Sequence, residues 1–217
     1  MKRKMFNFFN ISAFVVLMGV LASCNNSPKE LPYLGEKEVS TKTVNGKEVV
    51  DTIYHQIPDF SFTSQDSVEV TQKDVAGKIY VADFFFTTCP TICPKMKTQM
   101  LRIYEKYKDN PKVILLSHSI DPRHDTPAVL KEFAHNLGVD SKKWLMVTGD
   151  KQKIYAIGQK SYMVTATEDK TQPGGVVHSG AFILVDENRH IRGIYDGTVP
   201  AKVDELLADM EVLLGKK

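Results

Sequence analysis

From about Ile57 onward, apolar residues come in runs whose spacing alternates between strand-like and helical. Residues 78–86 (Lys-Ile-Tyr-Val-Ala-Asp-Phe-Phe-Phe) form a dense aromatic and β-branched run, which predicts a buried strand. Through residues 94–107 the apolar side chains recur at helical spacing, with a proline at the first position. This pattern predicts a helix. A second buried strand is predicted over residues 112–119.

The same alternation continues to the end of the chain. It predicts a helix at 127–137 capped by Asp125 or Thr126 and closed by Gly138, a strand at 144–147, a helix at 151–160, strands at 181–186 and 191–195, and a final helix at 203–214. The resulting order, β-α-β-α followed by β-β-α, is the thioredoxin topology. We therefore expect a single α/β domain with a central mixed sheet flanked by helices.

Residues 24–56 are more polar and are expected to form a tether and a small hairpin. The hairpin prediction rests on the pair Asn45-Gly46, which separates two short strand-like runs at 41–44 and 47–50. Residues 57–217 then form the domain, and this length is ample for one hydrophobic core.

The N-terminus carries a targeting pattern. Three basic residues (Lys2, Arg3 and Lys4) precede an apolar run at 11–22, and Leu-Ala-Ser-Cys follows, ending at Cys24. This order is typical of a secretory signal peptide and resembles the bacterial lipobox. We predict a signal peptide over residues 1–23, a lipid attached to Cys24, and a mature chain anchored to the membrane on its extracytoplasmic, periplasmic side.

The alternative is an uncleaved transmembrane anchor, for which the apolar run is short of the roughly 20 residues that a spanning helix needs. Both alternatives place residues 25–217 outside the cytoplasm. Removal of the signal peptide also changes the charge: the chain has 28 Lys and Arg against 26 Asp and Glu, and loss of three basic residues leaves 25 against 26. The near-neutral mature chain gives no electrostatic support for a nucleic-acid partner.

With Cys24 assigned to the lipid, Cys89 and Cys93 are the two remaining thiols. They stand in Phe-Thr-Thr-Cys-Pro-Thr-Ile-Cys-Pro, where the first core strand is expected to turn into a helix with Cys89 in the loop and Cys93 at the helix start. A helix N-terminus favours the thiolate, and two thiolates are soft donors that suit Cu(I) or Zn. Dithiol oxidoreductases of this fold have two residues between the cysteines and this chain has three, which leaves room for an ion.

A third ligand is expected to be a histidine. His178 stands in a loop, Gly-Gly-Val-Val-His-Ser-Gly, that enters the strand at 181 and is expected to lie beside the cysteine loop. Its main competitor is His118 at the end of a core strand, which could instead be a buried, hydrogen-bonded residue or a group that supports the ligands from behind. The other four histidines are predicted to lie at the surface: His55, His124, His135 and His190.

Three segments together resemble the SCO/SenC family of thioredoxin-like copper chaperones for cytochrome oxidase assembly. They are the cysteine segment at 86–94, Ser-Ile-Asp-Pro-Arg-His-Asp-Thr-Pro at 119–127, and Val-His-Ser at 177–179. The resemblance extends over about residues 57–214.

The resemblance implies that Cys89, Cys93 and His178 are copper ligands for Cu(I), with Cu(II) binding left open. It also implies that the partner is a recipient copper protein, a cytochrome oxidase subunit. Asp121 has two interpretations, a supporting position near the metal or a turn residue at the strand end. Two features depart from many family members: Thr91 replaces an acidic residue, and the anchor is a lipid instead of a transmembrane helix.

Three functions use these residues differently. A metallochaperone needs no turnover chemistry, only reduced cysteines that exchange copper with a recipient. A thiol-disulfide reductase would use one cysteine as the attacking thiolate and the other to resolve the mixed disulfide. A thiol peroxidase shares the fold, but a second cysteine four residues on is unusual for that mechanism.

Overall fold

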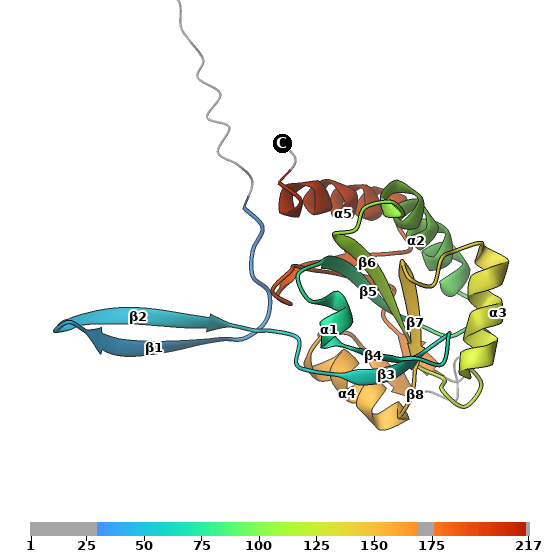
Figure 1. The fold of residues 1–217 in the computed structure, drawn as a ribbon, viewed down its shortest axis with the longest axis horizontal. Coiled ribbons are helices and arrows are strands. Elements are labelled where there is room, and N and C mark those ends of the chain that lie inside the picture. Colours follow the sequence, from blue (N-terminus) through green and yellow to red (C-terminus); the bar gives the residue numbers. More distant parts are fainter. Residues whose placement is uncertain (1–29, 169–175, 216–217) are drawn as a thin grey trace, which may run out of the picture.

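The computed structural model describes residues 30–168 and 176–215. Its centre is a seven-stranded mixed sheet in the order β11-β10-β5-β6-β7-β3-β4 (Figure 1). The strands of this sheet are β3 (Ser61–Ser64), β4 (Glu69–Thr71), β5 (Ile79–Phe85), β6 (Val113–Ser119), β7 (Trp144–Thr148), β10 (Ala181–Val185) and β11 (Ile191–Asp196). The three central strands β5, β6 and β7 run parallel, and all other pairs in the sheet are antiparallel.

Helices cover both faces of this sheet (Figure 1). The long ones are α2 (Cys93–Tyr107), α3 (Pro127–Leu137), α4 (Lys151–Lys160) and α5 (Pro200–Leu213), and α1 (Gln72–Val75) is a single turn. The apolar sides of α2, α3 and α5 pack on one face, whereas α1 and α4 pack on the other. Because side chains alternate along a strand, β5 and β6 supply apolar residues to both layers and are buried throughout. This arrangement confirms the predicted thioredoxin-like α/β fold.

Most of the predicted elements agree with the structure within three residues. Helix α4 has the predicted bounds, and α3 begins after Thr126, whose hydroxyl accepts from the Val129 N–H. Asp125 was the other predicted cap, and it has a different position, described below. Helix α5 begins earlier than predicted because Pro200 occupies its first turn.

Five elements were not predicted. Strands β3 and β4 and helix α1 are only three or four residues long, too short for a hydrophobic period to show. The other two are the short strands β8 (Ala166–Glu168) and β9 (Val176–His178), which pair as a small two-stranded sheet.

The N-terminal hairpin consists of β1 (Lys37–Val44) and β2 (Lys47–Tyr54) and extends away from the domain (Figure 1). Its strands are twice as long as the four-residue runs predicted around Asn45-Gly46. Both turn residues have positive φ (52° and 77°), as a tight two-residue hairpin turn requires.

Candidate metal and thiol site

The two cysteines lie where β5 passes into α2, as predicted. Cys89 is in the connecting loop, where its N–H donates to the Phe86 carbonyl at 3.2 Å, and Cys93 begins α2. Pro94 in the first turn needs no intrahelical hydrogen-bond partner there, which favours a helix start at this point. Cys89 is 7% exposed and Cys93 is partly buried. The loop therefore brings two thiols together at the rim of the domain.

The environments of the two sulfurs differ. Burial would raise the pKa of the Cys89 thiol, but hydrogen bonds from Cys93 and from Thr91 outweigh this effect, and the pKa is lowered. The Thr91 hydroxyl oxygen lies 3.7 Å from the Cys89 sulfur. The pKa of Cys93 is instead raised, first by burial and then by its hydrogen bond to Cys89 and the nearby Asp83 carboxylate. Cys89 is consequently the thiol that ionises first.

Asp83 is a buried carboxyl group beneath the cysteine loop. It lines a small cavity of about 20 Å³ together with Cys93, Ser117 and Trp144. The Ser117 hydroxyl donates to Asp83, and the Trp144 indole N–H donates to Ser117 at 2.8 Å. Burial raises the pKa of Asp83 to about 7. Asp83 is not among the predicted site residues, although an acidic residue inside the otherwise apolar run at 78–86 was a usable signal.

Asp125 fixes the cysteine loop from the neighbouring strand end. This fully buried carboxylate accepts hydrogen bonds from the Thr87 N–H (3.1 Å), the Thr87 hydroxyl (2.5 Å) and the Ser119 hydroxyl (2.6 Å). The prediction that Asp125 could cap α3 was therefore wrong, because its oxygens are occupied by Thr87 and Ser119. The loop that carries Cys89 is tied to the end of β6 through a charge-assisted network.

Asp121 begins the turn that positions Asp125. Its carbonyl accepts from the N–H groups of His124 (3.1 Å) and Asp125 (2.9 Å), and its own N–H donates to the Ser119 hydroxyl (3.2 Å). These contacts are those of a turn residue at a strand end. A supporting role for its carboxylate beside a metal stays a prediction.

His178 ends β9, where Ala166 is its partner on β8. The prediction that this segment is a loop was wrong, since residues 176–178 pair as a short strand. The His178 side chain lies outside the described residues, so its role as a ligand stays a prediction. Two residues after His178, a Cβ placed on Gly180 would lie 3.7 Å from Cδ1 of Ile92, and Ile92 lies in the sequence between the two cysteines. The segment that follows His178 thus runs beside the cysteine loop.

His118 is a core residue. It is fully buried, its ring stacks on Phe84 at 4.7 Å between centroids, and Phe62 meets it edge-on at 5.6 Å. Neither ring nitrogen has a hydrogen-bond partner of ordinary geometry among the described residues, and burial lowers the pKa of His118 to about 4. In that part of the chain, which excludes the His178 side chain, no three His, Cys, Asp or Glu side chains cluster as a metal site.

The remaining histidines divide into two pairs. His124 and His135 are exposed, as predicted. His55 and His190 are half-buried at the base of the hairpin, where His55 Nε2 lies 2.7 Å from the Ser161 carbonyl and His190 Nδ1 lies 2.8 Å from the His55 carbonyl. The surface prediction was wrong for these two because the hairpin base packs against the domain.

The predicted signal peptide and Cys24 lie outside the described residues. Within residues 30–168 and 176–215, no helix has the length and apolar character needed to cross a bilayer.

Comparison with known proteins gives consistent matches. The SCO1/SenC family model matches residues 51–215. The SCO1 protein homolog of Bacillus subtilis is 32% identical over 170 residues, which cover 76% of this chain and 86% of the relative. The chain spans most of the length of that relative.

Solved structures agree with this assignment. A SCO1/SenC family lipoprotein from Bacillus anthracis superposes with a TM-score of 0.68 at 30% identity, covering 74% of this chain and 95% of the other. BsSco superposes with a TM-score of 0.66 at 30% identity, covering 75% of this chain and 95% of the other. It is described as having a disulfide switch and as a member of the Sco family of cytochrome c oxidase assembly proteins. Arabidopsis thaliana ScoI with copper bound superposes with a TM-score of 0.61 at 25% identity, covering 74% of this chain and 98% of the other. The thioredoxin-like fold, the paired cysteines at the start of α2 and these matches together establish that the chain belongs to the SCO1/SenC family.

Proposed function

We propose that this protein is an extracytoplasmic copper-binding metallochaperone that delivers copper to a copper site of a respiratory cytochrome oxidase. The observation that carries the proposal is the pair of hydrogen-bonded sulfurs of Cys89 and Cys93, one of which has a lowered thiol pKa. Soft thiolate donors suit Cu(I). The copper-bound Arabidopsis relative and the oxidase-assembly family of BsSco support the same function.

Copper would be held by Cys89, Cys93 and His178. Ionisation of Cys89 is favoured in the free protein, whereas Cys93 is shielded and must lose its proton as the metal binds. Because a disulfide has no thiolate, the pair must be reduced before copper can load. The restraint of the cysteine loop by Asp125 keeps the two sulfurs in place, and Asp121 holds the turn behind them.

The proposal includes a lipid anchor on Cys24 that keeps the protein at the membrane, near the oxidase subunit that receives copper. The support for the anchor is the sequence pattern before Cys24 and the description of the Bacillus anthracis relative as a lipoprotein.

An anaerobic Cu(I) titration of the reduced protein against a competing chelator tests the ligand set. We expect one copper per chain, and His178→Ala should weaken binding at least about tenfold, which is roughly 1.4 kcal/mol. His135→Ala, an exposed histidine on α3, is the matched control and should bind like the natural chain. Equal affinity of both variants would remove His178 from the site.

A second function, thiol-disulfide reduction, is favoured by the asymmetry of the two thiols. The lowered pKa of Cys89 suits an attacking thiolate, and the shielded Cys93 suits a resolving thiol. Reduction of a disulfide substrate by the metal-free protein, compared with Cys93→Ser, measures this activity. Strong reduction without any copper binding would overturn the chaperone proposal.

A further inference from the structure

The hairpin of β1 and β2 stands apart from the family fold. The SCO1/SenC match begins at residue 51, so all of β1 and the first half of β2 precede it. Each strand pairs with the other and with no further strand in the described part of the chain. Val39, Val50 and Ile53 are 60%, 65% and 56% exposed. The hairpin therefore presents apolar side chains and two unpaired edges to its surroundings.

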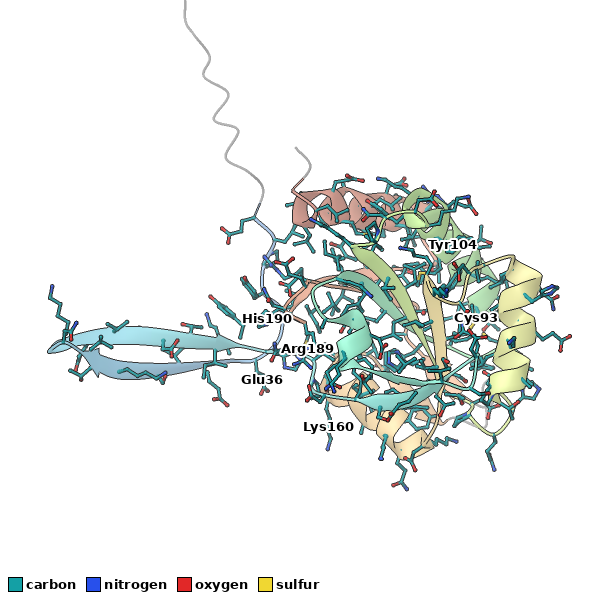
Figure 2. All side chains as sticks on the ribbon, viewed as in Figure 1. Glu36, Cys93, Tyr104, Lys160, Arg189 and His190 are labelled. Carbon is teal, nitrogen blue, oxygen red and sulfur yellow. The ribbon has the colours of Figure 1, made fainter. Side chains whose placement is uncertain are left out.

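The base of the hairpin is held firmly against the domain. Tyr33 stacks on Tyr54 at 4.3 Å between ring centroids, and His190 from the domain meets the Tyr33 ring edge-on at 5.2 Å. The His55 N–H donates to the Glu36 carbonyl at 3.0 Å, which closes the hairpin at this end. Because its base is fixed, the hairpin projects in a defined direction. Figure 2 shows it at one end of the longest axis, away from Cys93.

Both faces of the hairpin carry apolar and charged side chains. Val39 and Val50 share one face, where threonine is the residue opposite each of them. Ile53 lies on the other face, where Lys42 forms an ion pair with Asp51 at 2.6 Å. A two-stranded ribbon is marginally stable alone in water, and it gains stability when another strand adds to its edge.

The register of the hairpin determines which backbone groups point outward. The two-residue turn pairs Val44 with Lys47, and hydrogen-bonded and non-hydrogen-bonded pairs alternate from there. The N–H and C=O groups on the outer edge of β1 therefore belong to Lys37, Val39, Thr41 and Thr43. No proline or bulge interrupts this edge.

We propose that the outer edge of β1 pairs antiparallel with the same edge of a second copy of this chain, with Ser40 opposite Ser40. In this register the seven residues from Lys37 to Thr43 pair, and Glu38 of each copy lies opposite Lys42 of the other. Both Glu–Lys pairs fall at non-hydrogen-bonded positions, where facing side chains are closest.

Alternative registers either lose the charge pairs or pair fewer strand residues. A shift of two residues toward the turn places Glu38 opposite Val44 and Lys42 opposite Ser40, so both charge pairs are lost. A shift of two residues toward the base places Glu36 opposite Lys42 but pairs only the strand residues 37–41. Self-pairing of the β2 edge about Val49 places Lys47 opposite Asp51 but pairs only residues 47–51, because the turn precedes Lys47. The dimer is therefore a four-stranded sheet, β2-β1-β1-β2, whose two domains lie at its outer ends with the cysteine sites free.

Cysteine cross-linking tests this register in the full chain, purified in detergent. In a Cys89→Ser, Cys93→Ser background, Ser40→Cys should form a covalent dimer under mild oxidation, since facing strand residues are within disulfide range. Val50→Cys, at a more exposed position on β2, should form few covalent dimers. Dimers from Val50→Cys and none from Ser40→Cys would assign the contact to the other edge, and absence of dimers from both would also overturn the proposal.

A charge exchange tests the pairing independently. Sedimentation velocity should show a concentration-dependent dimer that Glu38→Lys weakens about tenfold. Glu38→Lys with Lys42→Glu and Asp51→Lys restores complementarity between the copies, keeps an ion pair within each hairpin, and should recover association. Glu48→Lys makes the same charge change as Glu38→Lys on β2 and serves as the control. A chain that stays monomeric throughout, or a triple exchange that fails to recover the dimer, would contradict the proposal.

Discussion

At the scale of single residues, donors surround the sulfur of Cys89. The Cys93 thiol, the backbone at residues 91 and 93, and the Thr91 hydroxyl all donate to it and together overcome the effect of burial. A carboxylate at position 91 would oppose ionisation of the Cys89 thiol, whereas the Thr91 hydroxyl supports it.

Thr91→Val keeps the shape of the side chain and removes one donor. We expect the pKa of Cys89 to rise, and loss of one hydrogen bond to the thiolate should slow alkylation by iodoacetamide about threefold at pH 7, because only the thiolate reacts. Thr88→Val, an exposed residue of the same loop, should leave the pH–rate profile unchanged. An identical profile for both variants would show that the Thr91 hydroxyl does not act on the sulfur.

At the scale of elements, the paired strands β5 and β6 each bury an ionisable group. Asp83 faces the layer of α2 and α3, whereas His118 faces the opposite layer beside Phe84. Burial favours the neutral form of both groups, with a pKa of about 7 for Asp83 and about 4 for His118. The two groups act on stability with opposite signs.

The signs follow from comparison with the pKa values in the unfolded chain, which are 3.8 for Asp83 and 6.5 for His118. The contribution of Asp83 is complete below pH 3.8 and is lost as the pH rises through about 7, whereas that of His118 is complete above pH 6.5 and is lost as the pH falls toward 4. We expect Asp83→Asn to become more stable relative to the natural chain as pH rises from 4 to 7. His118→Phe should become more stable relative to the natural chain as the pH falls from 6.5 to 4. In both cases the difference in the free energy of unfolding should change by up to about 1.4 kcal/mol per pH unit.

Urea unfolding at several pH values measures these slopes. His135→Gln, an exposed substitution, should follow the natural chain throughout. Parallel curves for Asp83→Asn and the natural chain would mean that Asp83 titrates normally in the folded protein.

The elements also show how far sequence reasoning extends. Helix α4 and strand β5 were predictable because their period or apolar density is strong over seven or more residues. The link from Asp125 to Thr87 was not, because it joins residues 38 positions apart that only the sheet brings together. The cysteine pair was predictable because its position depends on a local strand-to-helix junction. The short strand β9 was missed because its partner β8 is equally short and lies across residues 169–175.

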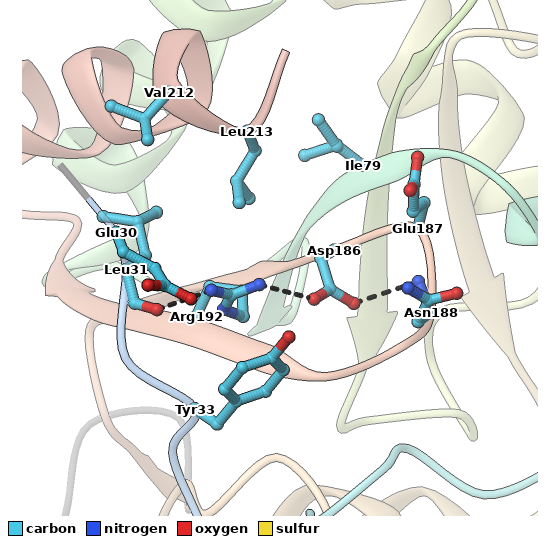
Figure 3. A pocket seen from close by; sticks show the side chains of 10 residues that line it. All are labelled: Glu30, Leu31, Tyr33, Ile79, Asp186, Glu187, Asn188, Arg192, Val212 and Leu213. Atoms are coloured by element: carbon cyan, nitrogen blue, oxygen red, sulfur yellow. Dashed lines mark hydrogen bonds and ion pairs between the residues drawn. The ribbon is translucent and has the colours of Figure 1, made fainter. Parts of the chain in front are cut away.

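At the scale of the whole molecule, Arg192 joins the N-terminal segment to the domain (Figure 3). Its guanidinium pairs with Asp186 at 2.9 Å, donates to the carbonyls of Leu31 and Pro32, and lies 4.0 Å from the centre of the Tyr33 ring. Leu31 itself is buried. The segment expected to be a free tether is therefore part of the domain from Leu31 onward.

Arg192→Met should leave Asp186 buried without its cation and lower the free energy of unfolding by about 3 kcal/mol. Amide hydrogen exchange at residues 31–35 should accelerate at the same time. Arg189→Met removes an ion pair to the exposed Asp59 and should cost about 1 kcal/mol or less. Equal losses for both variants would contradict a special role for Arg192.

The docking of Leu31 sets the reach of the protein. A fully extended chain spans at most about 25 Å from Cys24 to Leu31, and about 35 Å from Cys24 to Leu34, the next residue bound to the domain, whose N–H donates to the Ile191 carbonyl. With the lipid that we propose on Cys24, the Arg192 contacts thus shorten the tether by roughly 10 Å and confine the domain to a thinner layer above the bilayer. Within such a layer the effective concentration toward a membrane-embedded recipient is higher than a long flexible linker would give. Releasing Arg192 would then slow copper transfer between two membrane-bound partners without changing the affinity for the metal.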